Sequence, residues 1–251
     1  MLAEQRRDQI LSILDAKGSV SVNELYNQLK VSRETIRRDI TKLDSENRLR
    51  KTHGGALSVE AIEPVLEDRM SVNVEGKKEI GKAAAGLVPT GASLIIDSGT
   101  TTIWLAEALL QHHRLTVYTN DMHVASRLAG RNDNRVMMLG GEIQASEGAT
   151  FGRDATEMLG HYLVDLAFVS ASALSVNADL MDYTREAAEL RACMLKNSRV
   201  PVLLADKTKY QRTAPIRVAN LDKLTHLVTD EGPKSEIVKQ FASRDIEIIH
   251  V

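Results

Sequence analysis

The sequence has very little cysteine, no long apolar run and no metal-ligand pattern. Cys193 is the only cysteine in 251 residues, so an intrachain disulfide is excluded, and the seven histidines are scattered rather than closely spaced as zinc ligands are. No apolar run approaches the roughly 18 residues of a membrane-spanning helix. The N-terminal residues MLAEQRRDQI also lack the apolar segment of a secretory signal. We therefore expect a cytoplasmic protein without a structural metal, a cofactor or a membrane partner.

The chain also lacks a strong net charge, but its charge is unevenly distributed. The formal net charge is −2 at pH 7. Residues 1–55 carry eleven Lys and Arg against eight Asp and Glu, whereas the rest of the chain carries 21 against 26. A negative overall charge argues against a protein that coats DNA along its whole surface. A mildly basic N-terminal region on an acidic body instead favours local contact with phosphates.

Apolar periodicity predicts a winged helix-turn-helix domain over residues 1–56. Helical spacing of apolar residues covers 4–16 and 23–30, a short β-prone segment lies between them at 19–22, and a third helix follows Ser32. A basic hairpin, RLRKTHGGA, ends the region. Helix, strand, helix, turn, helix and hairpin follow one another in the order of a winged helix-turn-helix.

The third helix has the features of a DNA-recognition helix. Ile36, Ile40 and Leu43 repeat at spacings that turn them toward the other helices, which leaves a polar and basic face outward. Such a face can contact guanine edges and phosphates. For the arginines taken alone, a solvated helix face is the alternative. The predicted DNA-binding residues of the helix and hairpin are Ser32, Arg33, Thr35, Arg37, Arg38, Lys42, Arg50, Lys51 and His53.

A second, larger domain is expected over residues 77–251, after a linker. Residues 57–76 form a mixed, acidic stretch with Pro64 and no strong periodicity, which predicts the linker. From residue 77 onward, apolar runs of strand length alternate with helical segments. That alternation predicts an α/β domain with a mostly parallel sheet covered by helices on both faces.

The most informative part of the larger domain is a turn in IIDSGTTTIWLA, between a buried strand and a helix. Asp97 ends the strand, and Gly99 lets a ligand approach the backbone. Backbone N–H groups at a helix N-terminus, together with hydroxyls, form a cradle for phosphate or carboxylate. The alternative is an ordinary capped helix start, but a glycine and four hydroxyls exceed what capping needs. The four hydroxyls belong to Ser98, Thr100, Thr101 and Thr102.

Other polar turns follow the neighbouring predicted strands. They contain Asn120, Gly141, Ser170 and, in the segment DKTKY, Lys209. Because the carboxyl ends of parallel strands lie at one edge of a sheet, these turns are expected to converge on the cradle. Lys209, and Arg191 on the preceding helix, are expected to neutralise an anionic ligand, with plain surface charge as the alternative.

The motif SRETIRRDITKLDSENRLRKTHGGA resembles the signature of the DeoR family of bacterial transcriptional regulators. DSGTTT, TND, LGG and ADKTKY extend the resemblance across the larger domain. The resemblance implies a sensor domain similar to the sugar-phosphate isomerase and CoA-transferase fold, which responds to phosphorylated sugars or related intermediates. Its implied effector site, with the polar turns added, comprises Asp97, Ser98, Gly99, Thr100, Thr101, Thr102, Asn120, Gly141, Ser170, Asp182, Arg191 and Lys209.

Several positions depart from the pattern that the resemblance implies. Residues 170–175 read SASALS where a Gly-Ala-x-Gly segment is common, and Arg191 stands where Lys is usual. Ala187 replaces a frequent Glu, and Gln211 a common Gly. An Arg is not a neutral replacement for a Lys, because its planar fork binds carboxylates and phosphates through two bonds. A second negative group on the ligand would suit Arg191, so a phosphorylated sugar acid is one expected effector.

Together, these features predict a DNA-binding transcriptional regulator, a repressor of a sugar or sugar-acid catabolic operon that a phosphorylated metabolite relieves. We expect a homodimer or homotetramer bound to double-stranded operator DNA, and no enzymatic activity. The alternative is a sugar-phosphate isomerase-like enzyme with an appended DNA-binding head. Asp97, Asp121 or Glu142 would then supply a base, but no carboxylate pair, nucleophile with a base, or metal site is assignable.

Overall fold

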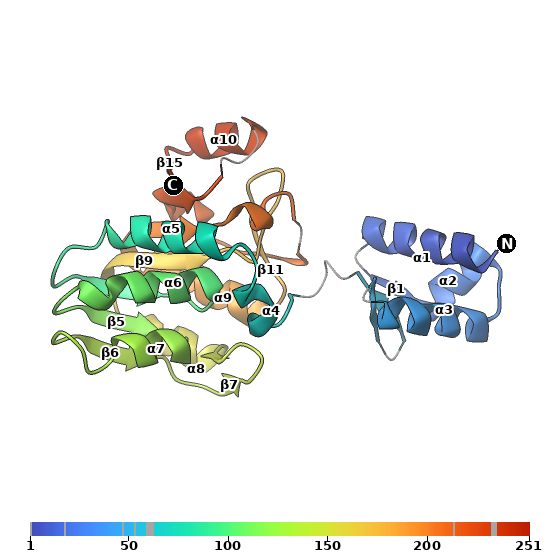
Figure 1. Cartoon of the computed structure of the whole chain (residues 1–251), viewed down its shortest axis with the longest axis horizontal. Coiled ribbons are helices and arrows are strands. Elements are labelled where there is room, and N and C mark those ends of the chain that lie inside the picture. The colour runs from blue at the N-terminus through green and yellow to red at the C-terminus, as the bar shows by residue number, and fades with distance from the viewer. Residues whose placement is uncertain are drawn as a thin grey trace. The chain divides into compact units, whose positions relative to one another are not determined.

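The computed structural model describes residues 2–17, 19–46, 48–52, 54–58, 63–212, 214–231 and 235–251 (Figure 1). The chain divides into two compact units, Met1–Glu63 and Pro64–Val251. The segment 57–76, which the sequence predicts as a linker, spans this division. Its second half is already helical, since it contains α4 (Leu66–Met70) and the start of α5 (Val74–Ala85).

The first unit has the predicted winged helix-turn-helix order. Its elements are α1 (Ala3–Lys17), β1 (Ser19–Ser21), α2 (Val22–Leu29), α3 (Arg33–Ser45), β2 (Arg50–Lys51) and β3 (Gly55–Leu57). The strands form a small antiparallel sheet in the order β1-β3-β2. Ile36, Ile40 and Leu43 of α3 are at most 1% exposed and pack with Ile10 and Leu25 of the other helices. The burial of one apolar stripe from each helix therefore fixes the outward face of α3.

Two serine caps start the second and third helices. The Ser32 hydroxyl accepts a hydrogen bond from the Thr35 backbone N–H at 3.1 Å, as the sequence predicts. Ser21 starts α2 with a full capping box, because its hydroxyl accepts from Glu24 N–H and the Glu24 carboxylate accepts from Ser21 N–H. The Ser32 cap lies at the tight turn between α2 and α3, whereas the Ser21 cap starts α2 at its other end.

The second unit is built on a seven-stranded sheet in which every neighbouring pair is parallel. The strand order is β15-β14-β12-β9-β4-β5-β6. The strands are β4 (Ser93–Ile96), β5 (Thr116–Thr119), β6 (Arg135–Met138), β9 (Val164–Ser170), β12 (Ser198–Leu204), β14 (His226–Thr229) and β15 (Glu247–His250). The predicted α/β class with a parallel sheet is confirmed.

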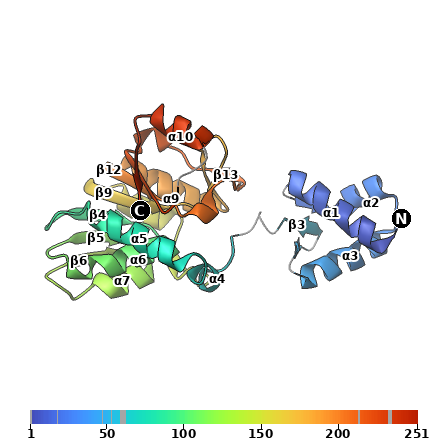
Figure 2. The same ribbon diagram turned by 45° about the horizontal axis from the view of Figure 1, so that its top comes forward.

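Helices cover both faces of this sheet (Figures 1 and 2). Leu94 and Ile96 of β4 pack against α5, α6 (Thr100–Ala108) and α7 (Met122–Leu128), whereas Ile95 packs into the cluster on the opposite face. That second cluster includes residues of α8 (Arg153–Leu159), α9 (Arg185–Lys196) and α10 (Ser235–Ala242). Alternate residues of a strand thus enter different cores, which explains the nearly continuous apolar strands in the sequence.

Short antiparallel elements, which the sequence does not predict, lie beyond the main sheet. β7 (Ile143–Gln144) and β8 (Ala149–Thr150) form a hairpin. β10 (Ala173–Leu174), β11 (Leu180–Asp182) and β13 (Ile216–Arg217) form a three-stranded sheet. Elements of two or three residues are too short for a period of two to be recognised. Among the described residues, no helix is both long and apolar enough to cross a bilayer.

Candidate functional site

The outward face of α3 presents arginines without intramolecular ion pairs. Arg37 and Arg38 are exposed, and neither they nor Arg50 on β2 form an ion pair with any residue that the structure describes. Burial of Ile36 and Ile40 forces these arginines outward because residues three and four apart share a helix face. Unpaired guanidinium groups on an exposed helix are available to phosphates and to guanine edges.

The other predicted DNA-binding residues have partners within the head. Arg33 Nε donates to Asn23 Oδ1 at 2.8 Å, Lys42 Nζ lies 3.1 Å from Glu46 Oε1, and Lys51 Nζ donates to Thr41 Oγ1 at 3.0 Å. These contacts are exposed and therefore weak enough to exchange for DNA phosphates. The Ser32 and Thr35 hydroxyls lie 2.9 Å apart at the helix start. His53 lies outside the described residues.

One buried ion pair in the head was not predicted. Asp39 of α3 accepts from Arg6 Nε at 2.5 Å and from Arg6 Nη2 at 3.2 Å, and both side chains are buried. The signal was available, because Asp39 falls between Ile36 and Ile40 on the inward side of the helix. A carboxylate at such a position needs a cation. This pair therefore attaches α3 to α1 and orients the recognition helix.

The predicted cradle lies where β4 ends and α6 begins. Gly99 has φ of +142°, and a Cβ at this position would lie 2.7 Å from Ser170 Oγ, so only glycine suits the turn. Asp97, Ser98, Thr100, Thr101 and Thr102 are all less than 5% exposed. Thr102 Oγ1 donates to the Gly99 carbonyl at 2.8 Å, so this hydroxyl closes the first helical turn. The turn thus places four hydroxyl residues at the N-terminus of α6, where backbone N–H groups favour an anion.

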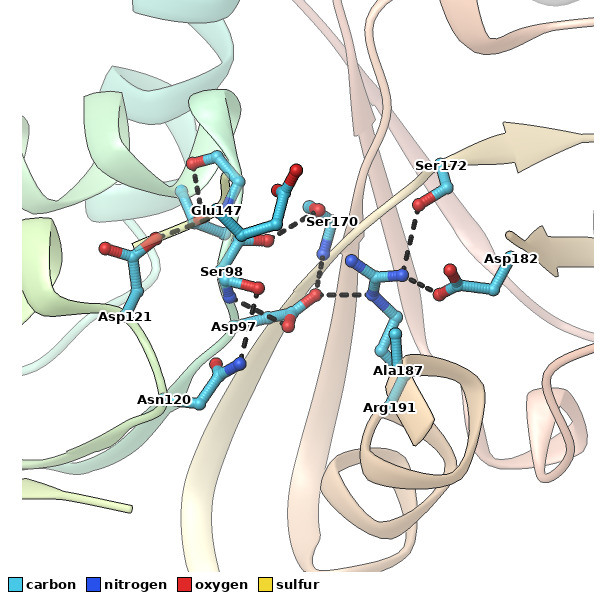
Figure 3. Close-up of polar contacts among 12 residues, drawn as sticks. Asp97, Ser98, Asn120, Asp121, Glu147, Ser170, Ser172, Asp182, Ala187 and Arg191 are labelled. Carbon is cyan, nitrogen blue, oxygen red and sulfur yellow. Dashed lines mark hydrogen bonds and ion pairs between the residues drawn. The ribbon is translucent and has the colours of Figure 1, made fainter. Parts of the chain in front are cut away.

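Neighbouring strand ends converge on this turn, as the sequence predicts (Figure 3). Asn120, after β5, donates through Nδ2 to Ser98 Oγ at 3.3 Å and to the Thr150 carbonyl at 3.0 Å. Ser170, at the end of β9, donates through Oγ to the Ser98 carbonyl at 3.0 Å. The parallel register of β5, β4 and β9 is what brings these three turns together.

Arg191 lies in a buried cluster with two carboxylates. Its Nε donates to Asp97 Oδ2 at 2.7 Å, and its Nη1 donates to Asp182 Oδ2 and, at 3.1 Å, to Ser172 Oγ (Figure 3). All three charged side chains are at most 6% exposed. The sequence suggested that Arg191 would balance a second negative group on the ligand. The structure instead supplies two negative groups from the protein, Asp97 and Asp182.

Two buried acceptors at the strand ends lack a hydrogen-bond donor among the described residues. Asn120 Oδ1 and Asp206 Oδ2 are fully buried and make no hydrogen bond. The orientation of the Asn120 amide is fixed, because the Thr150 carbonyl that it contacts can only accept. Buried acceptors need a donor, either from water or from a ligand hydroxyl. The cradle therefore offers donors for an anion and an acceptor for a hydroxyl.

Asp121 flanks the cradle and caps α7. Its Oδ1 accepts from the N–H groups of His123 and Val124 at 2.6 and 3.1 Å, and its Oδ2 accepts from Gly99 N–H at 3.3 Å. Burial raises the pKa of this carboxyl, and the three N–H groups oppose that rise. Asp121 therefore positions Gly99, and both of its carboxylate oxygens already accept backbone hydrogen bonds.

Two further predicted residues, Gly141 and Lys209, lie in turns that follow strands of the main sheet. Gly141, with φ of +119°, lies before the β7–β8 hairpin, beside the Phe151 carbonyl. Lys209 is buried in the turn after β12, and its N–H donates to the Asp206 carbonyl. Thr150, which fixes Asn120 from β8, was missed because it belongs to a two-residue strand.

Family comparisons match both units. A family model described as "DeoR-like helix-turn-helix domain" matches residues 6–61, and one described as "DeoR C terminal sensor domain" matches residues 72–231.

Curated relatives align with nearly the whole chain. The HTH-type transcriptional repressor CsqR of Escherichia coli K12 is 32% identical, over 97% of this chain and 94% of the relative. The glycerol-3-phosphate regulon repressor of the same strain is 28% identical over 99% of each chain. Among solved structures, ribose 5-phosphate isomerase A from Methanocaldococcus jannaschii is 17% identical over 55% of each chain, with a TM-score of 0.41.

Proposed function

Because the chain belongs to the DeoR family of transcriptional regulators, we propose that it represses a sugar or sugar-acid catabolic operon and that a phosphorylated metabolite releases it from DNA. The observation that carries this proposal is the pairing of an exposed basic helix with a buried anion cradle in one chain. Some of the relatives are named as repressors of the glycerol-3-phosphate regulon and, in one case, as "Putative aga operon transcriptional repressor", which supports a role in carbohydrate metabolism.

The DNA contact is assigned to the α3 face and the hairpin, with Arg37, Arg38 and Arg50 as the principal cations. Ser32, Thr35 and the helix N-terminus suit a backbone phosphate, and Arg33, Lys42 and Lys51 would exchange their exposed partners for phosphates. Paired operator half-sites would require a dimer or a tetramer, which is the assembly we propose. A role on chromosomal DNA places the protein in the cytoplasm.

Arg38→Ala tests the DNA assignment. If Arg38 contacts a base edge, the substitution should weaken binding to the DNA upstream of the chain's own gene by about 1–3 kcal/mol. Fluorescence anisotropy titration at a fixed salt concentration measures the loss. Arg185→Ala removes the same charge from an exposed position of the sensor domain and should leave the affinity unchanged. Equal affinities of the wild type and Arg38→Ala would contradict the assignment.

The effector is assigned to the cradle as a phosphorylated sugar or sugar acid. Ser98 to Thr102 and the α6 N-terminus would bind the phosphate, and the Asn120 Oδ1 acceptor would take a sugar hydroxyl. One side of the site would be formed by Asp182 and Arg191. Its remaining wall would be formed by Ser170, Gly141 and Lys209. A ligand with a neutral sugar part is favoured over a sugar acid. A ligand carboxylate would be repelled by Asp97 and Asp182, because Arg191 is already paired with both of them.

A thermal-shift screen tests the effector class. Sugar phosphates, glycerol 3-phosphate among them, should raise the melting temperature of the sensor domain, with about 2.7 kcal/mol of stabilisation at 100 times the dissociation constant. The same compounds without phosphate should have no effect. Stabilisation by the phosphate-free compounds alone would contradict a phosphate cradle.

The chain is proposed to have no enzymatic activity. A carboxylate can act as a general base only if it is available to the substrate. Asp97 is bound by Arg191 and by the N–H groups of Ser98 and Ser170, and Asp121 caps α7. Glu142 lines a separate cavity of about 280 Å³ between β7 and the start of α9. Turnover of a sugar phosphate by the purified chain would contradict this proposal.

A further inference from the structure

A part-buried ion pair connects the loop beside the cradle to the first helix of the sensor domain. Arg69 of α4 pairs through Nη2 with Glu147 Oε2, and the two side chains are 9% and 16% exposed. Glu147 lies in the loop between β7 and β8, and it is among the residues drawn with the cradle in Figure 3. An ion pair at this depth resists solvent competition, so its two ends move together or the pair breaks at a cost.

The Glu147 end of this pair is connected to the cradle by short polar contacts. Asn120 Nδ2 bonds to both Ser98 Oγ and the Thr150 carbonyl, and Thr150 N–H returns a bond to the Asn120 carbonyl at 2.9 Å. Thr150 belongs to β8, whose pairing with β7 closes the loop that carries Glu147. A ligand that contacts Ser98 or Asn120 can therefore displace β8 and, with it, the adjoining loop that carries Glu147.

The Arg69 end is connected to the point where the chain enters the sensor domain. Arg69 Nε donates to the carbonyl of Pro64, the first residue of this unit, at 2.8 Å. The Arg69 carbonyl accepts from the buried Lys77 Nζ of α5 at 2.7 Å. Burial lowers the pKa of Lys77 because the ammonium loses its water. Arg69 thus holds the entry segment, which leads from the DNA-binding head, against α5.

We propose that the Arg69–Glu147 pair transmits occupancy of the cradle to residues 64–70, so that both side chains position the entry segment for the response to effector. This proposal rests on the proposed function, because it requires an anionic ligand in the cradle. Through this pair, ligand binding can change the structure of the segment that joins the sensor domain to the head. A coupling of this kind needs a ligand-dependent change at both ends, and hydrogen exchange can detect such a change.

The first test uses the ligand-free full-length chain. Asn120→Ala removes the side-chain bonds to Ser98 Oγ and to the Thr150 carbonyl, and it should speed amide exchange in residues 64–70 by about threefold or more. Asn134→Ala is the matched control, since Asn134 accepts from Leu115 N–H at the opposite end of the strands. Unchanged exchange in residues 64–70 of Asn120→Ala, or an equal change in both variants, overturns the proposal.

The second test adds inorganic phosphate as the probe. In the wild type, phosphate should protect residues 97–102 and alter exchange in residues 64–70 by about threefold. Glu147→Ala should keep the first effect and lose the second, and Glu142→Ala, an exposed control on the same hairpin, should keep both. Arg69→Met also removes the bond to the Pro64 carbonyl, so its exchange without ligand will differ, but it should lose the phosphate response of residues 64–70 as Glu147→Ala does. The phosphate response of the double variant should be no different from that of either single variant.

The outcomes separate the two proposals. A response in residues 64–70 that persists in Glu147→Ala overturns the ion-pair linkage and leaves the cradle assignment intact. Failure of phosphate to protect residues 97–102 of the wild type contradicts the cradle assignment, and the Asn120→Ala comparison then decides the linkage alone.

Discussion

Helix α3 keeps Arg37 and Arg38 at the surface, whereas the sensor domain buries Arg191 between two carboxylates. Arg37 and Arg38 have no ion-pair partner among the described residues, and Arg191 has Asp97 and Asp182. An exposed cation costs little to maintain and can meet any phosphate that approaches. A buried cation loses its hydration, which costs free energy, so it needs partners of opposite charge. Those partners are then held in a fixed position. The α3 arginines are therefore available to an external anion, whereas Arg191 holds its neighbours in a fixed geometry.

Arg191→Met tests this comparison with the largest expected effect. The substitution leaves Asp97 and Asp182 buried without their cation, which should lower the free energy of unfolding by about 3–5 kcal/mol. Trp104, the only tryptophan, lies in α6, so its fluorescence during urea unfolding reports on the sensor domain. Arg185→Met removes an exposed arginine from the same helix, where it pairs with Glu189, and should be close to neutral. Equal losses would show that burial does not distinguish the two arginines.

Gly99→Ala is the next largest perturbation, and it tests how rigid the cradle is. Alanine would have to adopt φ near +142° with its Cβ against Ser170, which should cost about 1–3 kcal/mol. Gly140→Ala, in a turn at the same edge of the sheet, meets no atom within 4 Å and needs no unusual φ. The same urea titration measures both variants. A Gly99→Ala protein as stable as Gly140→Ala would mean that the turn can relax.

Asp165→Asn should give the smallest effect, and it sharpens the contrast between exposed and buried charge. The Ser93 hydroxyl and N–H donate to Asp165 and lower its pKa, with a smaller contribution from Arg199. A carboxyl with a lowered pKa stabilises the fold above its ordinary value near pH 4, and this stabilisation is lost as the pH falls through the lowered pKa. The midpoint of urea unfolding should therefore be higher for the wild type than for Asp165→Asn at pH 7, and the two midpoints should converge below pH 4. A difference that grows toward low pH would contradict the assignment.

The sequence predicted the head almost completely and the cradle in part. Ile36, Ile40 and Leu43 recur at helical spacing, so their burial and the opposite arginine face followed from local periodicity. The convergence of Ser98, Asn120 and Ser170 also followed, because a parallel sheet places the ends of its strands at one edge. The partners of Arg191 did not follow, since Asp97 lies 94 positions away along the chain and only the tertiary fold brings the pair together. Glu147 and Thr150 were missed because their hairpin is too short to show a period.

Thr100→Val tests the central claim most directly, because it removes one cradle hydroxyl while keeping the shape of the side chain. The measurement is release of the full-length protein from the DNA upstream of its own gene as sugar phosphates from the thermal-shift screen are added. Thr90→Val, an exposed change before the opposite end of β4, is the control. We predict unchanged DNA affinity for all three proteins and release that requires at least about tenfold more ligand in Thr100→Val, the equivalent of 1.4 kcal/mol. Release of Thr100→Val at the wild-type ligand concentration would contradict the cradle as the effector site.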